Sequence, residues 1–244
     1  GEEDRAAAFL SESLALFEEL GERWGTALVK FNLGWLVEYR DKYDEKKKFW
    51  EESLAGFRNA GDRWGQAVTL GALGYSARFE GDYKRAAAMS KESLQLFKEL
   101  GDKAGMAESL ARLASVAHRR SDYKQATTLY AESLTLREEL GDRLGMMQTK
   151  GLLGLVAAYQ GDYERATALL EESLQASREL ASGESATYLA SYLAMAAYFQ
   201  GDLERASALW EETLMFYRQV NDRVAVAYSI NYLGIVALQR GDPA

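Results

Sequence analysis

The chain has 244 residues, of which 48% are hydrophobic and 27% are charged, so its composition is that of a folded protein rather than a disordered one. Its net charge of −8 argues against nonspecific binding of the whole chain to nucleic acid or to an anionic membrane. It has no cysteine and one histidine, which excludes disulfides, thiolate catalysis and metal sites built from several cysteines or histidines.

No apolar run approaches the roughly 18 residues that a membrane span needs, and no secretory leader precedes the first repeat. We therefore expect a cytoplasmic protein that does not contact a membrane. Because the first residue is Gly1 rather than methionine, we also expect the chain to be a fragment of a longer protein.

The sequence repeats itself with a period of 40 residues. One marker occurs as Gly21-Glu22-Arg23-Trp24-Gly25, Gly61-Asp62-Arg63-Trp64-Gly65, Gly101-Asp102-Lys103-Ala104-Gly105 and Gly141-Asp142-Arg143-Leu144-Gly145. A second marker lies half a period away and includes Gly81-Asp82-Tyr83 and Gly161-Asp162-Tyr163. A fixed period of this size is typical of stacked, identical supersecondary units.

Between the markers, apolar residues recur three or four positions apart, which predicts amphipathic helices. Gly81 suits the left-handed position that ends a helix, and Asp82 suits the N-cap of the next one. The one proline, Pro243, lies too late to interrupt a helix. The pattern predicts about twelve antiparallel helices, near residues 4–19, 23–39, 43–59, 63–79, 83–99, 103–119, 123–139, 143–159, 163–179, 183–199, 203–219 and 223–239.

The helices alternate between two types. We name those that begin near residues 23, 63, 103, 143, 183 and 223 A-type, and the others B-type. Each A-type helix carries a leucine followed by Gly or Ala, as in Leu73-Gly74 and Leu113-Ala114, which predicts a packed scaffold. The B-type helices carry alanine at one repeat position. In the helix near residues 43–59, Lys46 replaces this alanine, which predicts local loosening of that repeat. We interpret Lys46-Lys47-Lys48 as a solvated helix face.

The run Leu73-Gly74, Ala77, Gly81-Asp82-Tyr83 and Ala86 resembles the tetratricopeptide repeat, and the equivalent run from Leu153 to Ala166 does so equally. The resemblance implies an all-α, right-handed superhelical solenoid that forms one domain over residues 1–244, with repeat markers at 1, 41, 81, 121, 161 and 201. The repeated Glu-Ser-Leu and Leu-Gly-Asp-Arg-x-Gly motifs are similar to the C-terminal sensor arrays of bacterial STAND-class signalling ATPases and transcriptional regulators. That similarity implies a sensor or docking role in signal transduction.

The chain begins on a B-type helix and ends after an A-type helix, so both terminal helices are predicted to be unpaired. Neither reads as the polar capping repeat that a free-standing solenoid needs. Either neighbouring repeats lie beyond the chain, or its ends stack on other copies. We expect end-to-end self-association.

Reactive groups are not arranged for catalysis. The carboxylate pairs Glu51-Glu52, Glu171-Glu172 and Glu211-Glu212 recur at one repeat position, where a solvated helix face explains them better than acid–base chemistry does. No phosphate-binding loop motif is present. We therefore predict that this segment is not an enzyme and takes no cofactor or metal.

In tetratricopeptide arrays the A-type helices line the concave face, and the resemblance places aromatic and basic side chains there. Such residues are the usual anchors of binding surfaces. The predicted ligand-binding residues are Phe31, Asn32, Trp35, Tyr39, Tyr75, Arg78, Arg112, His118, Arg119, Tyr159, Tyr188, Tyr192, Tyr228 and Asn231.

The functional hypothesis is that this face binds a protein, a peptide or a small effector, without a role for nucleic acid. The alternative is a purely structural scaffold for protein–protein interaction. In the same way, the aromatic residues could pack between helices, and Arg112 could simply pair with Glu108, four positions before it.

Overall fold

The computed structural model describes residues 2–38, 43–180 and 183–241, and all regular structure in these ranges is helical. The described residues form twelve helices: α1 (Glu2–Glu19), α2 (Arg23–Glu38), α3 (Tyr43–Ala60), α4 (Arg63–Phe79), α5 (Tyr83–Leu100), α6 (Lys103–Arg119), α7 (Tyr123–Leu140), α8 (Arg143–Tyr159), α9 (Tyr163–Glu179), α10 (Gly183–Gln200), α11 (Leu203–Gln219) and α12 (Arg223–Arg240). In this part of the chain, none of the helices is both long and apolar enough to cross a membrane. The predicted all-α fold is confirmed.

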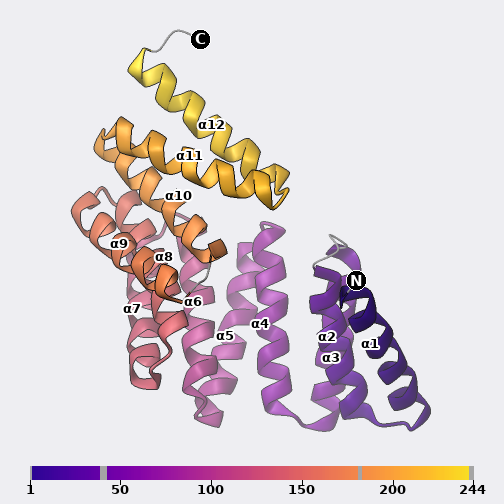
Figure 1. The fold of residues 1–244 in the computed structure, drawn as a ribbon. Helices are drawn as coiled ribbons and strands as arrows, with labels where there is room; N and C mark the ends of the chain where they lie inside the picture. Colours follow the sequence, from indigo (N-terminus) through magenta and orange to yellow (C-terminus); the bar gives the residue numbers. More distant parts are fainter. Residues whose placement is uncertain (1, 39–42, 181–182, 242–244) are drawn as a thin grey trace. The chain divides into compact units, whose positions relative to one another are not determined.

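The helices form two compact units, residues 1–120 and 121–244. Within each unit every helix packs on its neighbours in sequence, and Figure 1 shows α4 and α5 lying side by side. Four A-type helices, α2, α4, α8 and α10, pack most extensively on the B-type helix that follows them. Successive A-type helices also touch, α4 against α6 and α8 against α10. These local contacts define a solenoid of helical hairpins; one right-handed superhelix over both units stays a prediction.

The recurring Gly-Asp marker ends one helix and starts the next, as predicted. Gly81 has a φ of 79°, in the left-handed region that glycine enters without strain. The side chain of Asp82 then accepts a hydrogen bond of 3.0 Å from the backbone N–H of Arg85, in the first turn of α5. Ser121 and Asn221 replace the glycine at two equivalent positions and also have positive φ, 60° and 55°.

The small-residue position of the A-type helices brings two backbones close together. A Cβ atom on Gly74 would lie 2.9 Å from Ser90 Oγ and 3.2 Å from the carbonyl oxygen of Ala86, both on α5. On α8, a Cβ on Gly154 would lie 2.7 Å from Leu170 Cγ on α9. The neighbouring leucine column and the alanines of the B-type helices are buried except on the terminal helices α1 and α12, so these positions form the predicted scaffold.

The lysine run on α3 differs from its prediction. Lys46 is not part of a solvated face, because it is only 1% exposed and its ammonium nitrogen lies 6.0 Å from the ring centroid of Trp50. The aliphatic stem of lysine can pack in apolar surroundings, which explains how it fills a position that is otherwise alanine. Lys48 remains exposed, as expected. The predicted loosening of this repeat stays a prediction.

The recurring carboxylate pairs are explained by ion pairs between neighbouring helices. Glu51 lies 2.9 Å from Arg85 on α5, and Glu52 lies 2.8 Å from Lys30 on α2. Glu171 and Glu172 repeat the arrangement with Arg205 and Lys150. These are mainly exposed pairs, each of which typically contributes about 0–1 kcal/mol. Their role is structural, in keeping with the interpretation of these residues as helix-surface groups.

We predict that the Gly154→Ala variant destabilises the protein, whereas Gly234→Ala stabilises it. A methyl group on Gly154 would press on α9, and overpacking of this kind costs about 1–3 kcal/mol. A methyl group on Gly234 would meet nothing within 4 Å, and alanine favours an exposed helix by about 1 kcal/mol over glycine. Urea unfolding of dilute samples, followed by far-UV circular dichroism, measures both. Equal effects of the two substitutions would contradict the packing described here.

Candidate functional site

A row of aromatic side chains lies on the A-type helices of residues 1–120. Phe31 and Trp35 are one turn apart on α2, with ring centroids 6.4 Å apart. The ring centroid of Trp35 lies 6.1 Å from that of Tyr75 on α4, and the ring centroids of Tyr75 and Phe79 are 4.7 Å apart. We call Phe31, Trp35, Tyr75 and Phe79 the aromatic row. Phe79 is the most exposed member, at 55%.

Two arginines border the aromatic row. The guanidinium carbon of Arg78 lies 4.1 Å from the ring centroid of Phe79, and that of Arg112 lies 5.7 Å from the ring centroid of Tyr75. Arg112 also donates a hydrogen bond of 2.7 Å to the carbonyl oxygen of Gly71 and forms a 3.1 Å ion pair with Glu108. Arg112 therefore forms the ion pair with Glu108 that the alternative interpretation predicted, and these contacts hold its guanidinium against the aromatic row.

A pocket of about 340 Å³ opens beside the row, between α2, α4 and α6. Phe31, Trp35 and Arg112 line it, and Ser93 and Phe97 of α5 contribute to its wall. It brings together an apolar surface, a guanidinium and exposed carboxylates. Pockets that combine apolar walls with a few polar groups are the usual form of ligand sites.

Trp64 also lines this pocket, although the sequence analysis named it only as part of the repeat marker and not as a ligand-binding residue. Its indole N–H donates a 3.1 Å hydrogen bond to Asp102 Oδ2, while Asp102 Oδ1 accepts from the backbone N–H of Gly105 and caps α6. Trp24 and Asp62 repeat this arrangement one period earlier, at 2.8 Å. The sequence could have pointed to Trp64, because tryptophan occurs at this repeat position only in the first two copies and is replaced by Ala104 in the third.

His118 and Arg119 lie at the C-terminal end of α6. Burial, followed by the nearby positive charges of Arg119 and Arg78, lowers the pKa of His118 to about 4. The imidazole is therefore neutral at pH 7, and the positive charge on this face comes from its arginines. Arg119 is exposed at the helix end.

Residues 121–244 carry a second aromatic surface. Tyr159 stacks on Tyr123 with ring centroids 5.6 Å apart, and its hydroxyl lies 3.8 Å from Met195 Sδ. Phe199 lies 6.1 Å from Tyr159 and 6.4 Å from Tyr163. These side chains gather on α8 and α10 and the starts of α7 and α9.

The other predicted residues of this unit have different environments. Tyr188 is 44% exposed and lies 6.2 Å from Tyr217, whereas Tyr192 packs against the core cluster that contains Leu189 and Leu193. Tyr228 and Asn231 are exposed on α12. Tyr192 thus matches the alternative interpretation, in which aromatic residues pack between helices.

The predicted set is therefore only partly brought together. In the first unit, Phe31, Trp35, Tyr75, Arg78 and Arg112 are in mutual contact through the aromatic row. Asn32 is exposed on α2. Tyr39 lies outside the described residues.

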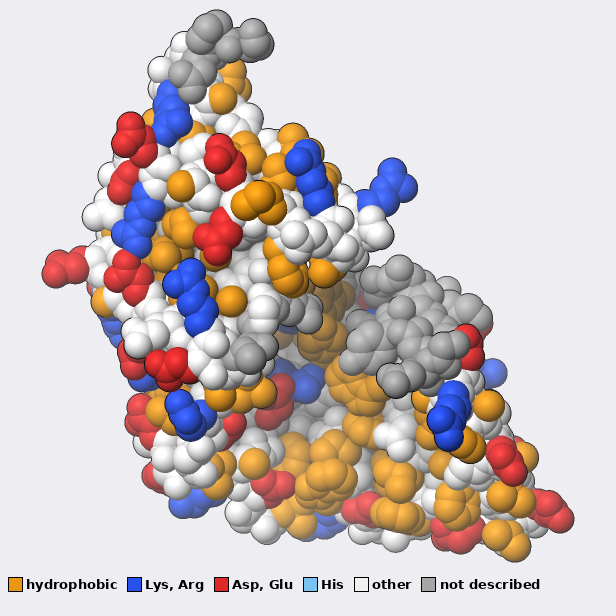
Figure 2. Space-filling view, in the orientation of Figure 1, with side chains coloured by type: hydrophobic (Ala, Val, Ile, Leu, Met, Phe, Trp, Pro, Cys, Tyr) orange, Lys and Arg blue, Asp and Glu red, His pale blue; other side chains and the backbone are white. Residues whose placement is uncertain are grey.

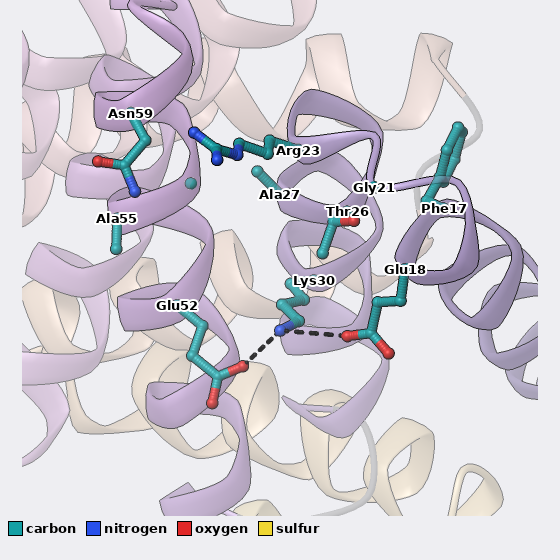
Figure 3. Close-up of a pocket in the computed structure, with 11 residues that line it drawn as sticks. Phe17, Glu18, Gly21, Arg23, Thr26, Ala27, Lys30, Glu52, Ala55 and Asn59 are labelled. Atoms are coloured by element: carbon teal, nitrogen blue, oxygen red, sulfur yellow. Dashed lines mark ion pairs between the residues drawn. The ribbon is translucent and has the colours of Figure 1, made fainter.

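A larger pocket of about 550 Å³ lies between α1, α2 and α3, on side chains that the sequence analysis did not select (Figure 3). Lys30 stands at its centre and pairs with Glu52 at 2.8 Å and with Glu18 at 3.6 Å. These carboxylates raise the pKa of Lys30, mainly through its hydrogen bond to Glu52. Because both carboxylates face the ammonium, the two ion pairs join α1, α2 and α3.

Within the described ranges, no cluster of three or more His, Asp or Glu side chains is placed to hold a metal ion. The aromatic row with its arginines is equipped for recognition of apolar and negatively charged groups.

Comparison with known proteins finds a family match for part of the chain. Residues 105–179 match the family model described as tetratricopeptide repeat. No curated protein matches the chain in sequence. The match supports the predicted tetratricopeptide repeat over these residues, and the solved structures share the predicted fold of stacked helical hairpins.

Three of these structures illustrate the likeness. BtubC from P. vanneervenii is 17% identical, with a TM-score of 0.72 over 91% of this chain and 93% of that one. A signal transduction ATPase with numerous domains (STAND) from Pyrococcus horikoshii, which has a tetratricopeptide repeat sensor, is 13% identical, with a TM-score of 0.71 over 98% of this chain and 38% of that one. A Rap protein complexed with competence and sporulation factor is 12% identical, with a TM-score of 0.68 over 91% of this chain and 67% of that one. At these identities the likeness concerns the fold.

We predict that the stability of the protein falls as the pH is lowered from 6.5 to 4, in part because of His118. Its pKa is about 4 in the folded protein against an ordinary value of 6.5, so the unfolded chain binds more protons in this window and is favoured there. The His118→Gln variant should show a flatter dependence of the unfolding free energy on pH. NMR titration of this single histidine provides the direct measurement, and a pKa near 6.5 would refute the assignment.

Proposed function

We propose that this tetratricopeptide-type array is a binding module that receives a peptide, or an extended segment of a protein, along the aromatic row of residues 1–120. The observation that supports the proposal is the 340 Å³ pocket beside the row, in which Phe31 and Trp35 offer an apolar wall and Arg112 a fixed cation. Aromatic and arginine side chains commonly supply most of the binding energy at interfaces.

The charges of the face indicate the chemistry of the ligand. Arg78 stacks on Phe79, and Arg119 is exposed at the end of α6, where both arginines act on His118 and lower its pKa. Arg112 is already bonded to Gly71 and Glu108, so it orients the site more than it offers a free charge. A ligand with a large apolar side chain for the pocket and an acidic residue near Arg119 would complement this surface.

The wider role that we propose is that of a sensor or docking module in a bacterial signalling regulator in the cytoplasm, with a peptide or a small effector as the signal. Two structural relatives support it: one is a STAND protein with a tetratricopeptide repeat sensor, and the other is a Rap protein in complex with competence and sporulation factor. In this proposal the exposed Tyr188 belongs to a separate recognition surface of the second unit. The module acts by binding rather than by catalysis.

Selection from a phage-displayed library of random twelve-residue peptides tests the proposal. The parent chain should enrich peptides that combine an aromatic or large aliphatic residue with Asp or Glu. The Phe79→Ser variant should weaken binding of a selected peptide about tenfold, which is a modest loss for an aromatic contact. The Arg119→Glu variant should bind acidic peptides less well and shift the selection towards Lys and Arg.

The Met215→Ser variant serves as the control, because Met215 is 60% exposed on α11 and belongs neither to the aromatic row nor to the lining of the pocket beside it. It should bind the selected peptides as the parent does. Circular dichroism spectra verify that all variants are folded. Independent selections that share no sequence feature would contradict the proposal and favour the alternative of a scaffold that holds folded partners.

A further inference from the structure

The last helix presents an apolar face that no other helix of its unit covers. Val224, Tyr228, Ile230 and Leu238 on α12 are 67%, 62%, 48% and 81% exposed. Figure 2 shows hydrophobic side chains at the surface in this region. An exposed patch of this kind usually marks an interaction site.

The shape of this face matches the one that an A-type helix presents to the B-type helix after it. Gly34, Gly74 and Gly154 are closely covered by Trp50, Ser90 and Leu170 of the following helix. Gly234 occupies the same repeat position on α12, but a Cβ there would meet nothing within 4 Å. The face of α12 around Gly234 therefore has the recess in which a following B-type helix would pack, and this recess is uncovered.

The first helix carries the complementary surface. By the 40-residue period, Ala6, Leu10 and Ser13 of α1 correspond to Ala86, Ser90 and Ser93 of α5. The three residues of α5 are almost completely buried, whereas those of α1 are only half-buried.

A repeated hydrogen bond points to the same fit. Ser53 Oγ and Ser93 Oγ each donate a 2.8 Å hydrogen bond to a carbonyl oxygen of the preceding A-type helix, those of Ala27 and Ala67. Ser13 on α1 and Ala227 on α12 are the equivalent donor and acceptor at the two ends of the chain.

The charges of the two end helices are also complementary. An arginine at the start of an A-type helix pairs with a glutamate 36 positions later in two repeats, Arg63 with Glu99 and Arg143 with Glu179. The same spacing, continued into a second copy, joins Arg223 of α12 to Glu19 of α1. In the described ranges, Arg223 and Glu19 form no ion pair with each other or with another residue.

We propose that α12 of one chain docks on α1 of a second copy, in the register in which α4 packs on α5. The inference goes beyond the proposed peptide-binding function, because it uses faces outside the aromatic row. Such an interface joins two different surfaces, so a docked pair still has one free α1 face and one free α12 face. Association then continues with concentration and does not stop at a dimer.

Sedimentation velocity of the chain at increasing concentration measures the association. We expect a sedimentation coefficient that keeps rising with concentration. Gly234→Trp should fill the recess and raise the apparent dissociation constant at least about tenfold. Arg223→Glu and Glu19→Arg should each weaken association by repulsion, whereas an equimolar mixture of these two variants should restore it, because their charges are again complementary.

The Met215→Lys variant is the control, since this exposed residue of α11 belongs to neither end face, and it should associate like the parent. A parent chain that remains monomeric at all concentrations would overturn the proposal. So would a limiting dimer, or association that Gly234→Trp leaves unchanged, because either would mean a different interface. Failure of the charge-reversed mixture to recover would show that the register is wrong.

Discussion

Within each unit, the close approach of an A-type helix to the B-type helix after it, as in α4–α5 and α8–α9, is the constraint on which the rest of the structure depends. At Gly74 and Gly154 the two backbones come so near that no side chain larger than a hydrogen atom fits without displacement. Leucine on one side and alanine on the other then fill the remaining space, as Leu73 and Ala86 do. Because this contact is local, each hairpin is stabilised by its neighbours, and the surfaces of the A-type helices are left to vary from copy to copy.

That separation of roles explains why the fold was more predictable than the site. The Gly-Asp marker can be interpreted from the sequence alone, because a left-handed residue followed by an N-cap is a local requirement that Gly81 and Asp82 satisfy. Helix positions and hairpin packing follow from such local rules. The sequence therefore predicted the order, type and approximate bounds of the helices.

The environments of individual side chains depend on contacts that the repeat pattern does not specify. Tyr192 and Tyr228 belong to the same predicted face, yet one packs on the core and the other is exposed. Lys46 was expected in solvent and is buried beside Trp50. Trp64 was overlooked because its importance comes from Asp102 on the next A-type helix, 38 positions away.

The bond between Trp64 and Asp102 has a practical consequence. One carboxylate both caps α6 and holds the indole, and the same indole forms part of the wall of the pocket beside the aromatic row. The emission of this tryptophan should therefore respond to two events, the arrival of a guest molecule in the pocket and the fraying of the first turn of α6. The hydrogen bond between the two side chains connects the occupancy of the pocket to the local order of the next repeat.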